Sequence, residues 1–336
     1  MEEDLILAKA TLASGGAVLI PKDYRVPVRI SRSTAGPGAG SRSVVFSFSG
    51  MRVKKAISTE SGEFVFDPEK RTLSKDGEII AKEVSIIPVG FHCPEQAFFN
   101  LEQKCMFDCL FCSSPLLERD ATKGLDAEKI ASMIRESKEN IDSIALTSGV
   151  KDSVKATVEK MVNCVAELHK EFPELPIGVE PYVDRTEQID KLHEAGASEI
   201  KINLETATDE LFKVFCPSLD RDNIFDMLAH SVKVFGKGKV SSNIIVGLGE
   251  SDDDIHQIIE RLCSMGVTPT VRGLRVGRYT SDILSKNGAS QPSPQRMVDI
   301  AKMVKETLSK YGLDTRSFDT MCLRCTCCDI VPFIDL

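Results

Sequence analysis

From about residue 95 onward, apolar strand-like runs alternate with helical patterns, and this alternation limits the fold more than any other feature. Strand-like runs include SIALTS at 143–148 and NIIVG at 243–247. Helical patterns cover about 126–139, 153–171, 186–195, 220–235, 252–265 and 293–311. Roughly six strand–helix units fold as a parallel sheet covered by helices. The sequence therefore predicts an α/β fold, a partial or full (β/α) barrel of the TIM type.

The first ninety residues have a different pattern. A short helical start (ILAKATLA) leads into STAGPGAGSRS at 33–43, which should be a loop. The alternating runs SVVFSFSG, EFVFD and GEIIAKEVSIIP follow, and they indicate a small antiparallel β-meander. We therefore expect a β-rich module over 1–92, a barrel over 93–316 and a Cys-rich segment over 317–336. The module could dock a protein substrate or partner, or only cover the barrel.

Composition excludes several classes of protein. The 336 residues are 42% hydrophobic, which is enough for a real core and excludes a disordered chain. The net charge of −8 argues against a dedicated nucleic-acid-binding protein. No run of 18 apolar residues occurs, and the acidic start MEEDLILAKA is unlike a signal peptide. We expect a soluble, cytoplasmic protein with no nucleic-acid or membrane partner.

Eleven cysteines are unusual in such a chain, because a reducing compartment has no general use for disulfides. Seven of them fall in two groups, which favours metal or cluster ligation. The first cysteine motif, KCMFDCLFC, contains Cys105, Cys109 and Cys112. The second cysteine motif, MCLRCTCCD, contains Cys322, Cys325, Cys327 and Cys328. The scattered cysteines are Cys93, Cys164, Cys216 and Cys263, of which Cys164 and Cys263 fit a hydrophobic core.

The first cysteine motif follows the first predicted strand of the barrel, at the edge where barrel enzymes place their chemistry. Its C-x3-C-x2-C spacing supplies three thiolates to one 4Fe–4S cluster and leaves one iron open. An open iron can bind a substrate or cofactor, as a three-ligand zinc site does. Phe111 would shield the cluster from water. The alternative is a set of buried or zinc-bound thiols, with His92 and Cys93 as the local candidates for a fourth ligand.

This motif, with an aromatic residue before its last cysteine, resembles the radical S-adenosylmethionine (radical SAM) superfamily over roughly residues 95–320. The resemblance implies that the open iron chelates S-adenosylmethionine. One electron then cleaves the C–S bond of S-adenosylmethionine, and the resulting 5′-deoxyadenosyl radical abstracts a substrate hydrogen atom. It also implies an external electron donor such as ferredoxin or flavodoxin.

Two further segments resemble cofactor-binding positions of the superfamily. In TSG at 147–149, Ser148 offers an acceptor and Gly149 allows close backbone approach, although an ordinary strand-ending turn is the alternative. In KINLET at 201–206, Asn203 and Glu205 should face the same side of a strand. This segment is similar to the biotin-synthase-like branch, in which such residues contact the cofactor. A surface position for Glu205 stays open.

The stretch NIIVGLGE at 243–250 resembles the strand that supports the adenine ring. Gly247 would let a flat ring lie against backbone, and Glu250 could cap the following helix. Arg272 and Arg275 lie on a late strand, where an arginine inside a barrel needs an anionic partner, so cofactor or substrate carboxylate contact is one interpretation. Solvated arginine is the other. Glu180, after the third strand, has the same two interpretations.

The second cysteine motif could hold a second 4Fe–4S cluster, with Cys322 and Cys325 as the safest ligands. Adjacent Cys327 and Cys328 cannot easily point into one cluster together. A zinc site is the rival, because C-x2-C is also half of a zinc knuckle, and a redox switch is a further possibility.

Two clusters fit radical enzymes that insert sulfur into C–H bonds, and the chain resembles biotin synthase and lipoyl synthase in this respect. It lacks the N-terminal auxiliary motif of classical lipoyl synthases, and it is similar to biotin-synthase-related archaeal proteins, including two-component lipoyl synthases. The resemblance implies an octanoyl chain on a lipoyl domain or another acyl-carrying protein, and a possible second radical SAM protein. The alternatives are modification of a peptide or cofactor precursor without sulfur insertion, and a non-enzymatic iron–sulfur redox or scaffold protein.

Overall fold

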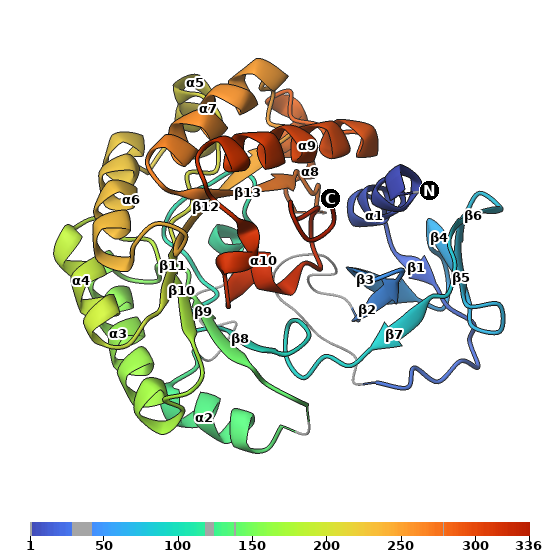
Figure 1. Ribbon diagram of the computed structural model, residues 1–336, viewed down its shortest axis with the longest axis horizontal. Coiled ribbons are helices and arrows are strands. Elements are labelled where there is room, and N and C mark those ends of the chain that lie inside the picture. Colours follow the sequence, from blue (N-terminus) through green and yellow to red (C-terminus); the bar gives the residue numbers. More distant parts are fainter. Residues whose placement is uncertain (1, 29–41, 118–123, 138, 278) are drawn as a thin grey trace.

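The computed structural model describes residues 2–28, 42–117, 124–137, 139–277 and 279–336. It contains two sheets, and the C-terminal end of the chain lies between them (Figure 1). Residues 33–41 of the predicted loop lie outside the described residues, and Ser43 already begins a strand.

The larger part of the chain forms a six-stranded sheet with the order β13-β12-β11-β10-β9-β8, in which each strand runs parallel to its neighbours. Its strands are β8 (Gln96–Asn100), β9 (Ser143–Thr147), β10 (Ile177–Glu180), β11 (Glu199–Lys201), β12 (Val240–Val246) and β13 (Thr268–Gly273). Within the described residues β13 does not pair with β8, so the sheet is an open barrel. The α/β barrel prediction is confirmed in its partial form.

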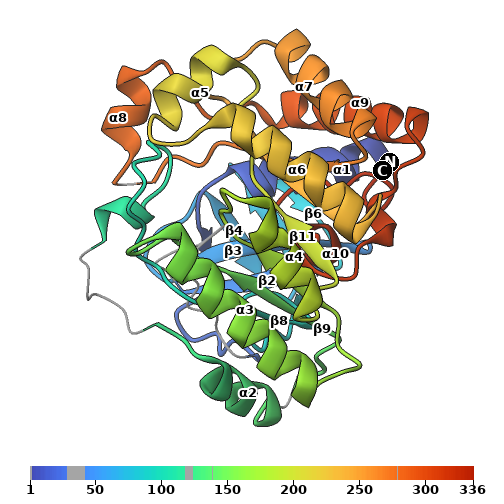
Figure 2. The same cartoon turned by 90° about the vertical axis from the view of Figure 1, so that its left-hand side faces the viewer.

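Helices cover the outer face of this sheet, as Figures 1 and 2 show. They include α2 (Ala127–Arg135), α3 (Val154–Glu171), α4 (Thr186–Glu194), α5 (Asp209–Phe215), α6 (Arg221–Phe235), α7 (Asp252–Ser264) and α9 (Pro294–Lys310), and α8 (Ser281–Lys286) is a short further helix. The predicted N-cap is confirmed, because the Asp126 carboxylate accepts a 2.9 Å hydrogen bond from the Lys129 amide. Helix α5 was not predicted.

The main hydrophobic core lies between the six-stranded sheet and these helices. Cys164 of α3 and Cys263 of α7 are buried in it, which confirms their prediction as core residues. Burial raises the pKa of each of the two thiols to about 12, because the apolar surroundings disfavour the thiolate. Both cysteines are therefore structural.

The N-terminal part forms a seven-stranded sheet with the order β6-β5-β4-β1-β3-β2-β7. Its strands are β1 (Val18–Leu19), β2 (Ser43–Phe48), β3 (Met51–Ser58), β4 (Phe64–Asp67), β5 (Thr72–Lys75), β6 (Glu78–Ala81) and β7 (Ser85–Ile87). The prediction of a purely antiparallel meander is wrong at β1, which runs parallel to both β3 and β4. A two-residue strand is too short to show an alternating pattern, and it was therefore not predicted.

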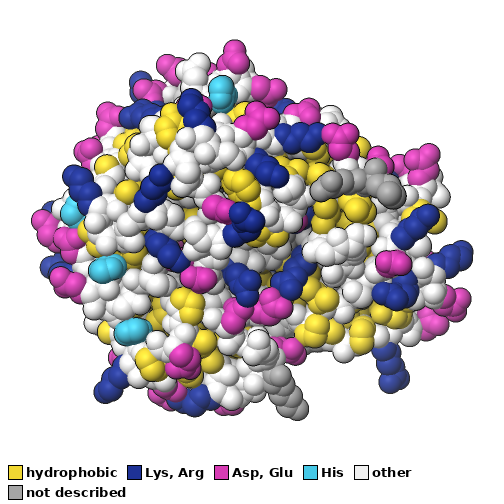
Figure 3. Space-filling view, in the orientation of Figure 1, with side chains coloured by type: hydrophobic (Ala, Val, Ile, Leu, Met, Phe, Trp, Pro, Cys, Tyr) yellow, Lys and Arg dark blue, Asp and Glu magenta, His cyan; other side chains and the backbone are white. Residues whose placement is uncertain are grey.

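The N-terminal sheet shares its core with the barrel side of the molecule. Helix α1 (Glu2–Ser14) packs against α9, and the buried cluster of this sheet includes Val298 and Ala301 of α9 and Ile330 near the C-terminus. Lys9 and Asp335 form a buried 2.5 Å ion pair between the two ends of the chain. Acidic and basic side chains are interspersed over the face seen in Figure 3. No helix in the described part of the chain is both long and apolar enough to span a bilayer.

Candidate active site

A cavity of about 280 Å³ lies inside the open barrel and joins the two cysteine motifs. Cys105 and Cys112 line it on one side. Cys322, Cys325 and Cys328 line it on the other. The two motifs therefore line the same cavity, although more than 200 residues of sequence separate them.

The loop of the first cysteine motif is held by backbone bonds to neighbouring loops. The Met106 amide donates to the Val150 carbonyl (2.6 Å), and the Leu110 amide donates to the Phe215 carbonyl (2.9 Å). Its three cysteines are half-buried. This soft-thiolate donor set at the rim of a cavity fits the 4Fe–4S cluster that the motif predicts.

Two of the predicted site residues on this loop, Cys109 and Phe111, do not line the cavity. The Cys109 sulfur accepts a hydrogen bond from the buried thiol of Cys216, and this bond together with burial raises the pKa of Cys216. Phe111 packs against the main core. That Phe111 shields the cluster from water stays a prediction.

Ser148 and Gly149 line the cavity next to this loop. The Gly149 amide donates to the Glu102 carbonyl (2.7 Å), and a Cβ at Gly149 would lie 2.6 Å from the Lys104 carbonyl oxygen. Close backbone approach therefore requires glycine here. The Ser148 hydroxyl donates to the Gly149 carbonyl (2.9 Å).

Glu180 also lines the cavity and belongs to a buried polar network. Its carboxylate accepts a 2.8 Å bond from the Asn203 amide and lies 3.2 Å from the Lys201 ammonium. Burial opposes ionisation, but Lys201, Asn203 and Arg272 outweigh it and keep the pKa of Glu180 below its usual value. Glu180 is therefore an anion inside the barrel rather than a solvated surface group.

Glu205 interacts electrostatically with Lys201, Glu180 and Arg272 of this network, but its hydrogen-bond partner is a different residue. Its carboxylate accepts a 2.6 Å bond from the Asn243 amide, and its φ of 70° is left-handed. Burial raises the pKa of Glu205, so it is not the surface residue that one interpretation suggested. It does not line the cavity.

The expectation that Glu250 caps the following helix is wrong, since Ser251 is the N-cap of α7. The buried Glu250 carboxylate instead accepts bonds from the Gly247 amide (2.7 Å) and the Leu248 amide (2.9 Å), and it pairs with Arg296 at 3.2 Å. Two amides in a buried turn need an acceptor, and Glu250 supplies it. Gly247 packs against Ser290, so both residues shape the turn and neither lines the cavity.

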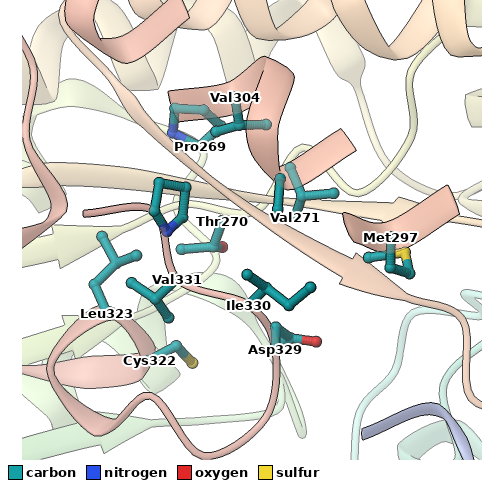
Figure 4. Close-up of a pocket in the computed structure, with 12 residues that line it drawn as sticks. Pro269, Thr270, Val271, Met297, Val304, Cys322, Leu323, Asp329, Ile330 and Val331 are labelled. Atoms are coloured by element: carbon teal, nitrogen blue, oxygen red, sulfur yellow. The ribbon is translucent and has the colours of Figure 1, made fainter. Parts of the chain in front are cut away.

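The anionic partner of the two late arginines comes from the C-terminal segment, defined as residues 317–336. Arg272 bonds Asp329 at 2.9 Å and donates to the Cys322 sulfur at 3.2 Å. Arg275 donates to the Cys328 carbonyl at 2.6 Å. Figure 4 shows a neighbouring pocket, which is lined by Cys322 and Asp329 of the C-terminal segment and by Thr270 and Val271 of strand β13. The solvated interpretation is therefore wrong for both arginines, which hold the C-terminal segment in place.

The C-terminal segment crosses the barrel interior near the amino ends of the strands. The Gln96 side chain of β8 accepts from the Met321 amide (2.9 Å), and the Glu199 carboxylate of β11 accepts from the Asp319 and Thr320 amides (2.8 and 3.0 Å). Helix α10 (Met321–Cys325) follows directly. Sequence reasoning missed Gln96, Glu199 and Lys201, although a buried polar residue within an apolar strand is a recognisable signal.

The second cysteine motif is split by this arrangement. The Cys327 thiol turns away from the cavity and donates to the Cys325 carbonyl at 3.1 Å, as is expected for the neighbour of a cavity-facing Cys328. Cys93, which precedes β8, lines the cavity in its place.

Comparison with known proteins defines the class of this one. The model of the radical SAM superfamily matches residues 100–262. These residues therefore form a radical SAM domain, and the protein is a radical SAM enzyme, a class that uses a 4Fe–4S cluster and S-adenosylmethionine. The non-enzymatic alternative is set aside by this match.

Within that class, the chain is related to lipoyl synthases. It is 24% identical over 225 residues to the lipoyl synthase of Buchnera aphidicola subsp. Schizaphis graminum (strain Sg), covering 66% of this chain and 68% of that one. It is 24% identical over 254 residues to the lipoyl synthase of Leptospira biflexa serovar Patoc (strain Patoc 1 / Ames), covering 71% and 78%. Among solved structures, methylornithine synthase matches with a TM-score of 0.52, 16% identity and 63% of each chain, which supports the fold.

Proposed function

We propose that this radical SAM enzyme inserts sulfur into an unreactive C–H bond of an octanoyl chain carried by a lipoyl domain or another acyl-carrying protein. The observation that carries the proposal is the single cavity lined by both cysteine motifs. A carbon radical formed there would lie within one enclosed space with a sulfur donor. The relationship to lipoyl synthases supports the same function.

The two cysteine motifs have different roles in this proposal. Cys105, Cys109 and Cys112 would hold the first cluster, and the second motif would contribute ligands to another. When bound, the first cluster and S-adenosylmethionine supply the radical that removes a hydrogen atom, and the second cluster supplies the sulfur. Ser148 and Glu180 offer acceptors that fit the ammonium group of S-adenosylmethionine.

Three residues predicted to contact the cofactor instead have a supporting role in this proposal. Arg272 and Arg275 anchor the C-terminal segment, and Glu250 holds a turn. The segment closes the amino ends of the strands and excludes water from the space where the radical forms, which prevents its loss to side reactions.

Partners follow from this chemistry. Each radical requires one electron, so a reduced ferredoxin or flavodoxin is the expected donor. A second radical SAM protein would share the two sulfur insertions that a complete lipoyl group needs. A cytoplasmic location fits iron–sulfur chemistry in a reducing compartment.

The first experiment measures 5′-deoxyadenosine released from S-adenosylmethionine by the anaerobically reconstituted protein with a reductant. Wild type should release it, and Cys105→Ala/Cys112→Ala should release none. Cys263→Ala, which removes a core thiol far from the cavity lining, is the matched control and should retain release.

The second experiment adds an octanoyl-lysyl peptide and measures its mass. The product should gain one sulfur atom, and Cys322→Ala should abolish this gain while still releasing 5′-deoxyadenosine. Release of 5′-deoxyadenosine with no sulfur gain, either alone or with a partner radical SAM protein, would contradict the proposal and favour modification of a peptide or cofactor precursor.

A further inference from the structure

We propose that Cys93 is a ligand of the second cluster, together with Cys322, Cys325 and Cys328, and that Cys327 is not. This inference rests on the proposed function only in assuming that a second cluster exists. It departs from the sequence pattern, which places all four candidate ligands in the MCLRCTCCD stretch.

The chain presents Cys93 to the C-terminal segment through a fixed turn. Cys93 is 1% exposed and forms an isolated β-bridge with Gln96. The Gln96 side chain accepts from the Met321 amide (2.9 Å) and donates to the Met321 carbonyl (3.3 Å). The residue that positions Cys93 is therefore the residue that locks the start of α10.

The lining of the cavity separates the cysteines. Cys93, Cys322, Cys325 and Cys328 line the cavity, and Cys327 does not. The thiols of Cys93 and Cys327 both bond the Cys325 sulfur, and the Cys327 thiol also donates to the Cys325 carbonyl at 3.1 Å. The Cys327 carbonyl accepts from the Lys54 amide of β3 (2.8 Å), and the Cys327 side chain packs in one buried cluster with Val45, Val89, Cys93 and Cys325.

Buried cations surround these four sulfur atoms. Lys201 and Arg272 approach the Cys322 sulfur at 3.7 and 3.2 Å. Lys54 is fully buried, its ammonium bonds the His92 carbonyl at 2.5 Å, and it interacts electrostatically with Cys93, Cys325, Cys327 and Cys328.

A buried ammonium is unfavourable unless a negative charge balances it. Glu180 and Asp329 accompany Lys201 and Arg272, whereas the hydrogen-bond partners of the Lys54 ammonium among the described residues are the carbonyl oxygen and an imidazole nitrogen of His92. Four thiolates outweigh the positive charge of a 4Fe–4S core, so a bound cluster carries net negative charge. Such a group would balance Lys54, and neutral thiols would not.

The test uses a full-length background in which Cys105, Cys109 and Cys112 are replaced by Ala, so that only the second site can hold iron. After anaerobic reconstitution with iron and sulfide, this background should contain about four irons per chain, the content of one 4Fe–4S cluster. Adding Cys93→Ala should lower the iron content or change the EPR spectrum of the reduced cluster, because only three of its four thiolate ligands remain. Adding Cys327→Ala, which removes a neighbouring buried thiol, should leave the iron content and the EPR spectrum of the reduced cluster unchanged.

Iron retained with an unchanged spectrum in the Cys93→Ala protein, or iron lost to the same extent in the Cys327→Ala protein, overturns the ligand assignment. If Cys93→Ala does not fold, Cys93→Ser differs by one atom and must change the EPR spectrum or lose iron; an unchanged spectrum overturns the assignment as well. A background that binds zinc or no metal at all overturns instead the sulfur donor of the proposed function, which separates the two failures.

Discussion

Glu250 holds the turn after β12 through three bonds to one buried carboxylate. It accepts from two backbone amides and pairs with Arg296, which also bonds Asp252. Buried amides without an acceptor cost about 1–3 kcal/mol each, and breaking a buried ion pair costs about 3–5 kcal/mol. The turn therefore depends on the charge of this side chain and not only on its shape.

We expect Glu250→Gln to lower the free energy of unfolding by about 3 kcal/mol, since the amide keeps the shape but loses the charge. Urea unfolding of the cluster-free chain measures this. The control is Glu260→Gln, which removes a carboxylate from a surface contact with Lys310 and Tyr311 and should have little effect. Equal losses in both variants would contradict the role given to Glu250.

Residue chemistry was predictable from the sequence, but residue partners were not. The need of Arg272 for an anion follows from its place in a barrel strand, yet its partner Asp329 lies 57 positions away. The same holds for Cys93, which spacing separates from the second motif and the fold brings beside Cys325. The spacing of cysteines in the sequence indicates which ligands lie on the same loop, but which loops lie close together depends on the three-dimensional fold.

Thiol reactivity should separate the structural cysteines from the cavity cysteines. With pKa values of about 12, Cys164 and Cys263 hold about one thiolate in ten thousand molecules at pH 8, and each unit rise in pH raises this fraction about tenfold. We expect iodoacetamide to label half-buried Cys105 in the native cluster-free chain and to leave both core cysteines unlabelled until denaturant is added. Peptide mass mapping measures this, and equal labelling rates would contradict it.

At the scale of elements, the alternation of apolar strand-like runs and helical patterns predicted the barrel strands and helices, because long periodic segments carry strong signals. The predicted helix at 153–171 is α3, which begins after the Ser153 N-cap. Short elements, including β1 and α5, were not predicted. The position of the C-terminal segment was not predicted for another reason, because its hydrogen bonds go to Gln96 and Glu199 on strands that are distant in sequence.

Strand β10 lies against the C-terminal segment at Gly178. A Cβ at Gly178 would collide with the Thr320 hydroxyl and lie 3.2 Å from the Met321 side chain. Only a residue without a side chain lets the segment lie against the strand at this point. Gly178 is therefore a packing requirement of the cavity wall.

We expect Gly178→Ala to loosen the C-terminal segment, because overpacking costs about 1–3 kcal/mol. Trypsin cleavage after Arg324 should become about five- to 150-fold faster, the factor that corresponds to this energy. The control is Gly277→Ala, whose Cβ would meet only the Thr280 hydroxyl at 3.7 Å. A cleavage rate equal to that of wild type would show that the segment does not depend on Gly178.

At the scale of the whole molecule, the two ends of the chain are joined. The Lys9 ammonium lies 2.5 Å from the Asp335 carboxylate and bonds the Thr326 carbonyl at 2.8 Å, and both charged side chains are buried. Asp335 also accepts from the Val331 amide at 2.7 Å. Helix α1 thus fixes the C-terminal segment, which in turn lines the cavity.

We expect Lys9→Met to destabilise the protein by about 3–5 kcal/mol, because it leaves the Asp335 charge buried and unpaired. The double variant Lys9→Met/Asp335→Asn should be more stable than the sum of the single losses predicts, by about 0.5–3 kcal/mol. Urea unfolding of the four proteins of this cycle measures the coupling. Additive losses would show that the pair does not act as a unit.

The bond between Lys9 and Asp335 also sets an order of events during synthesis. Lys9 is synthesised 326 residues before Asp335. At about 5–20 residues per second, this separation corresponds to a delay of tens of seconds. During that time the nascent chain exposes the thiols of its first cysteine motif, while the opposite wall of the cavity does not yet exist. Iron delivered to the unfinished chain would meet half of a site. Loading of the second site therefore has to wait until the C-terminal segment has been synthesised and has packed against the barrel.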